Sequence, residues 1–211
     1  MDEHHHSSGE SATHCRIMQA ALSELTQRGY KGTSTRTIAE RAGVNEVTLF
    51  RHFGSKQQMF RAAVTHAIKE WSVPDSLDDY LQLSFPEGLA KFAHDYLLQI
   101  SRNSDIIMLG LAESFSHPLI IEVLQAFWAR VRLSLVHYFE ELERQGRMRE
   151  ADYPVLTQMI LTTLNSTPMI RKRSSDELIR YVTDERVVAT LVQTITSAYG
   201  LEQDGDTRVT T

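Results

Sequence analysis

An all-α protein in two parts is the fold class that this sequence predicts: an N-terminal three-helix helix-turn-helix domain followed by a larger helical domain. Apolar residues recur at spacings of three and four along most of the chain, which is the period of an amphipathic helix. No stretch shows the two-residue alternation of a strand, and no internal repeat is present. The 211 residues are 42% hydrophobic and 23% charged, which is typical of a globular chain of one or two domains.

The expected division of the chain follows its composition. Residues 1–12 (MDEHHHSSGESA) are a polar, tag-like or disordered tail, residues 13–61 the small domain, residues 62–202 the helical body, and residues 203–211 a frayed tail. His4 to His6 are interpreted as part of the tail and not as a metal site, because nothing holds three adjacent imidazoles in a fixed geometry.

Four helices and their turns are predicted in the first part of the chain. The helices span 16–28, 35–42, 46–53 and 56 to about 71, with Ser34, Asn45 and Ser55 as N-caps and with turns at Gly29, Gly43-Val44 and Gly54. Ser55 and Gln58 form the pattern of a capping box. The glycine turn between the second and third helices is typical of a helix-turn-helix.

Helices are predicted throughout the rest of the chain. They span about 86–101, 105–115, 118–145, 154–169 and 184–199, with a brief helix capped by Ser174 and Glu177, and with Asp152 and Asp184 as further N-caps. Arg171-Lys172-Arg173 is expected in a solvated loop.

The distribution of charge favours a nucleic-acid-binding segment. Residues 16–61 carry eight Arg and Lys against three Glu, a net charge of +5, so the other residues must carry −10 to give the chain's total of −5. A cationic segment beside an acidic body is typical of a DNA-binding module joined to another domain. The third helix agrees with this: its first turn, 45–48, offers short and polar side chains to a major groove, while Leu49 and Phe53 form an apolar back.

A known family is similar to this segment almost position by position. The run T-I-A-E-R-A-G-V-N-E-V-T-L-F-R-H-F-G-S-K, residues 37–56, resembles the signature of the tetracycline-repressor (TetR) family, and the resemblance extends over residues 16–61. Beyond them it is one of architecture only. It implies a bacterial transcriptional regulator, usually a repressor, that binds a palindromic operator as a homodimer. It also implies release by a small-molecule effector bound in a C-terminal ligand-binding and dimerisation domain.

The resemblance implies roles for individual residues of the small domain. Arg36 corresponds to a groove-facing arginine suited to guanine, and Glu46 and Val47 occupy positions that vary specificity. Phosphate contacts are implied for Thr35, Thr48, His52 and Lys56.

Three of these positions leave alternatives open. Phe50 replaces the family's common tyrosine, so a hydroxyl-to-phosphate bond is lost, although its ring can still press on a sugar or a thymine methyl. Glu46 either accepts a bond from cytosine N4 or only complements the helix N-terminus. Arg51 is interpreted as a solvated or phosphate-facing arginine.

The body is expected to hold the effector pocket and the dimer interface. Candidates for the pocket are Met108, Phe115, Phe127, Trp128, His137 and Tyr138, each of which alone also fits an ordinary core position. Candidates for an isologous four-helix interface are Met159, Thr163, Ser166, Val188, Leu191, Val192 and Ile195, and the alternative is two ordinary core helices. His94, His117 and His137 lack metal-ligand spacing, so neither metal nor cofactor is expected.

Other classes of protein fit the sequence less well. We find no Gly-rich phosphate loop, nucleophile elbow or H-E-x-x-H motif, so an enzyme is not expected. A purely structural bundle leaves the cationic segment unexplained. A repressor controlled by a protein partner, or by nothing, remains an alternative. Cys15 is the single cysteine, the N-terminus shows no secretion signal, and no apolar run can span a bilayer, so we expect a cytoplasmic protein, nucleoid-associated when bound to DNA.

Overall fold

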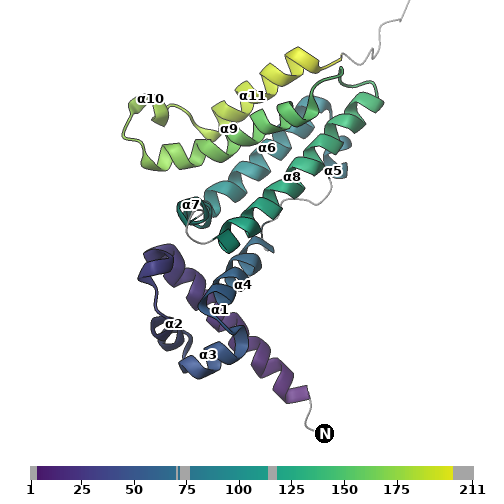
Figure 1. Cartoon of the computed structure of the whole chain (residues 1–211). Coiled ribbons are helices and arrows are strands. Elements are labelled where there is room, and N and C mark those ends of the chain that lie inside the picture. The colour runs from purple at the N-terminus through teal and green to yellow at the C-terminus, as the bar shows by residue number, and fades with distance from the viewer. Residues whose placement is uncertain (1–3, 70, 72–76, 114–117, 202–211) are drawn as a thin grey trace, which may run out of the picture. The chain divides into compact units, whose positions relative to one another are not determined.

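The computed structural model describes residues 4–69, 71, 77–113 and 118–201, and side chains at 4–11, 113 and 118–120 are not described. These parts of the chain form helices without a strand (Figure 1), apart from one isolated bridge between Met148 and Gly200, which confirms the all-α fold class. None of the helices they contain is long and apolar enough to cross a membrane. The predicted tail at 203–211 lies outside the described residues.

Two compact units make up the chain, and each is described by itself. The first contains Met1–Ser72 and Asp105–Phe127, and the second contains Val73–Ser104 and Trp128–Thr211. This division differs from the predicted one at 61/62 because the fourth helix packs along the first helix and so belongs wholly to the first unit.

The helix-turn-helix lies in the first unit. Its helices are α1 (His4–Gly32), α2 (Thr35–Ala42), α3 (Glu46–Phe53) and α4 (Lys56–Lys69). All three predicted N-caps are confirmed. Ser34 Oγ, Asn45 Oδ1 and Ser55 Oγ accept hydrogen bonds from the amides of Thr37, Thr48 and Gln58 at 3.1, 2.8 and 3.2 Å. Gly43 and Gly54 follow α2 and α3 with positive φ, as predicted. Gly29 also has positive φ and interrupts α1 at the predicted helix end, and a further short helical stretch continues to Gly32.

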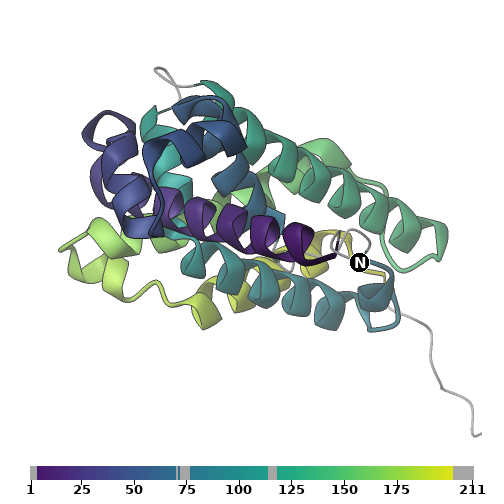
Figure 2. The ribbon, with the colours of Figure 1, turned by 90° about the horizontal axis from the view of Figure 1, so that it is seen from below.

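The first helix begins at His4, twelve residues before the predicted start at residue 16. Residues 4–12, predicted as part of a tail, continue α1 towards the N-terminus. Extending a helix that is already formed costs little, and no proline interrupts this segment. In Figure 2, α2 lies beside the C-terminal part of α1, and α1 also packs against α4.

The second unit is a helical bundle. It contains α5 (Asp78–Leu81), α6 (Phe85–Arg102), α9 (Tyr153–Arg173), α10 (Glu177–Arg180) and α11 (Asp184–Tyr199), together with the second part of α8 (Pro118–Arg144). The remaining helix, α7 (Ser104–Glu113), lies mostly in the first unit. Helix α6 packs against both α9 and α11.

Three local predictions in the second unit were wrong. Helix α9 runs through Pro168 to Arg173, so Arg171-Lys172-Arg173 forms its last turn and not a loop. Cations in a last turn are stabilised by the helix dipole, which explains the position of this basic run. The N-caps of α10 and α11 are Asp176 and Thr183, where Ser174 and Asp184 were predicted. Ser174 instead ends α9 as its C-cap, and Asp184 is already the first residue of α11.

A glycine in α6 allows a close approach inside the second unit. A Cβ at Gly88 would lie 2.5 Å from Tyr138 Oη and 2.6 Å from the Tyr80 carbonyl oxygen. Gly88→Ala is therefore expected to lower the free energy of unfolding by about 1–3 kcal/mol, measured by urea unfolding. Adding Tyr138→Phe should not restore stability, because the Tyr80 carbonyl still blocks the methyl group. Stability equal to or above wild type, as helix propensity alone would give, contradicts this packing.

Candidate nucleic-acid interface

Helix α3 separates an anchored face from an open face. Leu49 is fully buried and Phe53 is 9% exposed, so the apolar back predicted for this helix is held in the core of the first unit. On the open side Val47 is 77% exposed and Phe50 is 41% exposed, and Arg51 is exposed as well. Large apolar side chains left exposed on a helix that is otherwise anchored mark a contact surface.

The start of α3 is fixed by hydrogen bonds. The Asn45 side chain caps the helix, and Thr35 Oγ1 donates a hydrogen bond to Glu46 Oε2 at 2.6 Å. This second bond links the first residue of α2 to the first residue of α3, so it holds the two helices of the motif at their shared end. Thr35, Glu46 and Thr48 are all half-buried.

Arg36 lies exposed on α2, where its charge is only weakly engaged. Its Nε donates a hydrogen bond to Glu40 Oε1 at 3.0 Å, one turn further along α2, and both side chains are largely exposed. An exposed pair of this kind contributes about 0.3–0.5 kcal/mol. Arg36 can therefore leave Glu40 for a base edge at little cost.

Lys56 and His52 have close neighbours inside the first unit. Lys56 Nζ donates hydrogen bonds to the Tyr30 and Thr33 carbonyl oxygens at 2.7 and 2.5 Å, so it ties the start of α4 to the end of α1. His52 is half-buried, and the centre of its ring lies 5.9 Å from that of His14. The phosphate contacts implied for both residues stay predictions.

Two features of the domain were missed by the sequence analysis. The carboxylate of Glu24 on α1 is buried between Arg28 and Arg41, at 3.2 and 3.1 Å, and so ties α1 to α2. His14 stacks on Phe53, with 4.4 Å between ring centres. Glu24 had a visible signal, since it lies three residues after Ala21 on the apolar stripe of α1.

The role of Glu46 can be tested by one substitution. Glu46→Gln keeps an acceptor for Thr35 but removes a negative charge near the proposed path of the DNA backbone. We expect affinity for DNA of any sequence to rise about 2- to 10-fold at low salt, because repulsion is removed. Fluorescence anisotropy with matched and scrambled duplexes measures this. If the substitution changes affinity only for duplexes that contain one particular G·C pair, the result would instead support the contact with cytosine N4.

The residues predicted for the effector pocket fall in both units, and their joint role stays a prediction. Met108 and Phe127 lie in the first unit, whereas Trp128, His137 and Tyr138 lie in the second, and Phe115 lies outside the described residues. Phe127 and Tyr138 are buried. His137 is exposed, and its Nδ1 lies 3.8 Å from Glu140 Oε2. Burial strongly raises the pKa of the Tyr138 hydroxyl, which therefore stays protonated.

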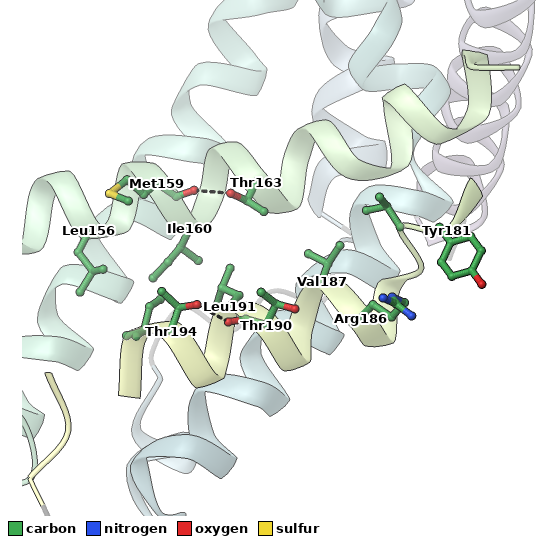
Figure 3. A pocket seen from close by; sticks show the side chains of 12 residues that line it. Leu156, Met159, Ile160, Thr163, Tyr181, Arg186, Val187, Thr190, Leu191 and Thr194 are labelled. Carbon is green, nitrogen blue, oxygen red and sulfur yellow. Dashed lines mark hydrogen bonds between the residues drawn. The ribbon is translucent and has the colours of Figure 1, made fainter. Parts of the chain in front are cut away.

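An open apolar groove runs between α9 and α11 in the second unit (Figure 3), and we call it the α9–α11 groove. Its volume is about 480 Å³. Four of the residues predicted for the dimer interface line it: Met159, Thr163, Leu191 and Ile195. Val188 is buried, while Ser166 and Val192 are half-buried. Other large apolar residues exposed on α9, on α10 or between α10 and α11 are Val155, Ile170, Leu178, Tyr181 and Val182.

Two short helices around a glycine turn, the second with a buried back and an exposed tip, define a helix-turn-helix DNA-binding protein. Residues 17–63 match the family described as bacterial regulatory proteins, tetR family. Residues 17–63 therefore form a helix-turn-helix domain of the tetR family, and the chain is a DNA-binding transcriptional regulator.

Comparisons with individual proteins agree with this. The chain is 27% identical over 135 residues to an uncharacterized HTH-type transcriptional regulator, YvkB, of Bacillus subtilis, covering 64% of this chain and 69% of that protein. It is 46% identical over 50 residues to the HTH-type transcriptional repressor Rv3405c of Mycobacterium tuberculosis, covering 24% and 27% of the two chains. A transcriptional regulator from Saccharomonospora viridis, solved in complex with choline, shares the fold with a TM-score of 0.70 at 16% identity, covering 91% and 100%.

Proposed function

We propose that this regulator is a homodimeric repressor that binds a palindromic operator in the cytoplasm and leaves it when a small molecule binds the helical body. The observation that carries the proposal is the exposed tip of α3, with Val47 77% exposed above the buried Leu49. Such a helix can enter a major groove, where side chains distinguish all four base pairs. One of the relatives is named a transcriptional repressor, which supports repression over activation.

The α9–α11 groove supports the proposal of a dimer. Met159 is 63% exposed at its rim, and apolar side chains of both helices line it (Figure 3). An isologous interface formed by two such faces would bury these side chains. The two copies of α3 would then need a separation of about 34–36 Å to enter successive major grooves.

Buried polar atoms in the second unit support an effector. Among the described residues, Ser101 Oγ, Trp128 Nε1, Tyr138 Oη and Thr157 Oγ1 are buried without a hydrogen-bond partner. An unsatisfied buried polar group costs about 1–3 kcal/mol, so a ligand that pairs with such groups gains affinity from them. The choline bound by the Saccharomonospora regulator is an example of a small-molecule ligand on this fold.

The most direct experiment starts from DNA that the purified protein retains. Genomic fragments bound at low salt are sequenced, and an inverted repeat with half-sites about one helical turn apart is expected. Absence of any enriched sequence would overturn the proposal. Adding a library of small molecules to the complex then tests release. Release by no compound, with the operator still bound, favours the alternative of a partner-controlled or constitutive repressor.

A further inference from the structure

A cleft between α1 and α4 in the first unit has a cationic lining, and we call it the α1–α4 cleft. Its volume is about 520 Å³, and eight side chains of the described chain line it without an acidic residue among them. Arg61 and Lys69 are charged, and His14 and His66 can be. Arg61, Thr65 and Lys69 recur every four residues, so one face of α4 supplies most of the lining.

The cleft borders one residue of the predicted DNA surface. His14 lines the cleft, stacks on Phe53 at 4.4 Å and lies 5.9 Å from His52, both on α3. His52 is one of the residues for which a phosphate contact is implied. One histidine therefore borders both the cleft and the recognition helix.

The electrostatics of the cleft favour an anion. Burial lowers the pKa of His14, and the positive charges of His52 and His66 lower it further. Among the described side chains, the ionisable groups that act on His14 or line the cleft with it are basic: His52 from α3, and Arg61, His66 and Lys69 from α4. An anion among them would offset this repulsion and favour the imidazolium form of His14.

We propose that the α1–α4 cleft is a phosphate-binding site. The phosphate belongs either to the backbone of the DNA flanking an operator half-site or to a phosphorylated small molecule. Both carry negatively charged phosphate oxygens that the same cations can bind. Arginine and lysine are the side chains that hold phosphate oxygens most often in proteins, and imidazolium adds a further donor.

The first experiment needs no DNA. Pyrophosphate is titrated into the full chain while the histidine ring signals are followed by NMR. We expect saturable shifts of the His14 and His66 signals and at least about a 5-fold loss of affinity in Arg61→Gln/Lys69→Gln. Both substituted residues are exposed, so the fold should be kept. Lys31→Gln/Arg149→Gln removes the same charge from exposed positions outside the cleft and should bind as wild type does. Equal affinity in all three proteins would overturn the proposal.

The pH dependence gives a second readout with a defined sign. Because the pKa of His14 is low in the free protein, binding an anion takes up a proton at pH values between the free and bound pKa. Pyrophosphate affinity should therefore rise as the pH falls from 8 to 6, and this rise should be weaker in His14→Asn. Without ligand, the folded state should lose stability as the pH falls from 6.5 through the lower folded pKa of His14, because the unfolded chain binds that proton more tightly.

A titration with operator DNA distinguishes a backbone phosphate from a phosphorylated small molecule. This experiment rests on the proposed function, because it requires that the protein binds an operator. If the occupant is a backbone phosphate, the cleft variant should lower the slope of log affinity against log salt by about 1–2 relative to the control variant. An unchanged slope, with pyrophosphate binding intact in the wild type, identifies a phosphorylated small molecule as the occupant. If the wild type binds no operator but still binds pyrophosphate, the proposed function is wrong. The proposal that the α1–α4 cleft binds phosphate is then still supported.

Discussion

Met159→Asp is expected to convert the proposed dimer into a monomer and to weaken operator binding by at least about 100-fold. The side chain lies at the rim of the α9–α11 groove and is 63% exposed, so the folded subunit should tolerate a carboxylate there. In an isologous interface the substitution appears twice, and two unpaired charges are then buried at a cost of several kcal/mol. A monomer binds only one half-site. It therefore loses the additional affinity that a dimer obtains by binding two linked half-sites at once.

Leu133→Asp is the matched control for this experiment. Leu133 is 71% exposed on α8 and does not line the groove, so the same change of chemistry is made away from the proposed interface. Analytical ultracentrifugation gives the mass, and fluorescence anisotropy gives the operator affinity. A Met159→Asp protein that stays dimeric, or a loss of affinity equal in both variants, would rule out this face as the interface.

Arg36→Ala should lower operator affinity by about 5- to 150-fold, the equivalent of about 1–3 kcal/mol for a bidentate contact with guanine. The loss should be concentrated on operators that keep that guanine, because the contact reads a base and not the backbone. Its ion pair with Glu40 is exposed, so the variant should remain as stable as wild type within about 0.5 kcal/mol.

Two controls accompany Arg36→Ala. Glu40→Gln releases Arg36 and should leave affinity unchanged or slightly higher. Arg132→Ala removes an exposed arginine from the second unit and should have no effect on DNA binding. If Arg36→Ala weakens all sequences equally, Arg36 contacts phosphate and does not specify a base.

The helix-turn-helix could be predicted because its signals are local. The Ser34 and Asn45 caps each bond an amide three residues away, and the positive φ of Gly43 is a property of one residue. Such features depend on short sequences and not on the rest of the fold. The same locality explains why cap positions in α10 and α11 were wrong by only one or two residues.

The contacts that support the recognition helix could not be predicted in this way. His14 and Phe53 are 39 residues apart in sequence, and Lys56 reaches carbonyls 23 and 26 residues earlier. Those pairings depend on how α1 crosses α3 and α4, which periodicity does not specify. The α9–α11 groove is similar: spacing indicated two apolar faces, but only packing shows that Val188 is buried and that Met159 is exposed.

Specific binding requires that α3 reads base edges with its exposed tip, and the base preferences of the operator measure this directly. Every single-base variant of the retained operator is titrated with the wild type and with Val47→Ala. We expect the preference at one or two symmetric positions to change by at least about 5-fold, with other positions and the salt dependence unchanged. If Val47→Ala leaves the preference at every position as it is in the wild type, α3 does not read the operator.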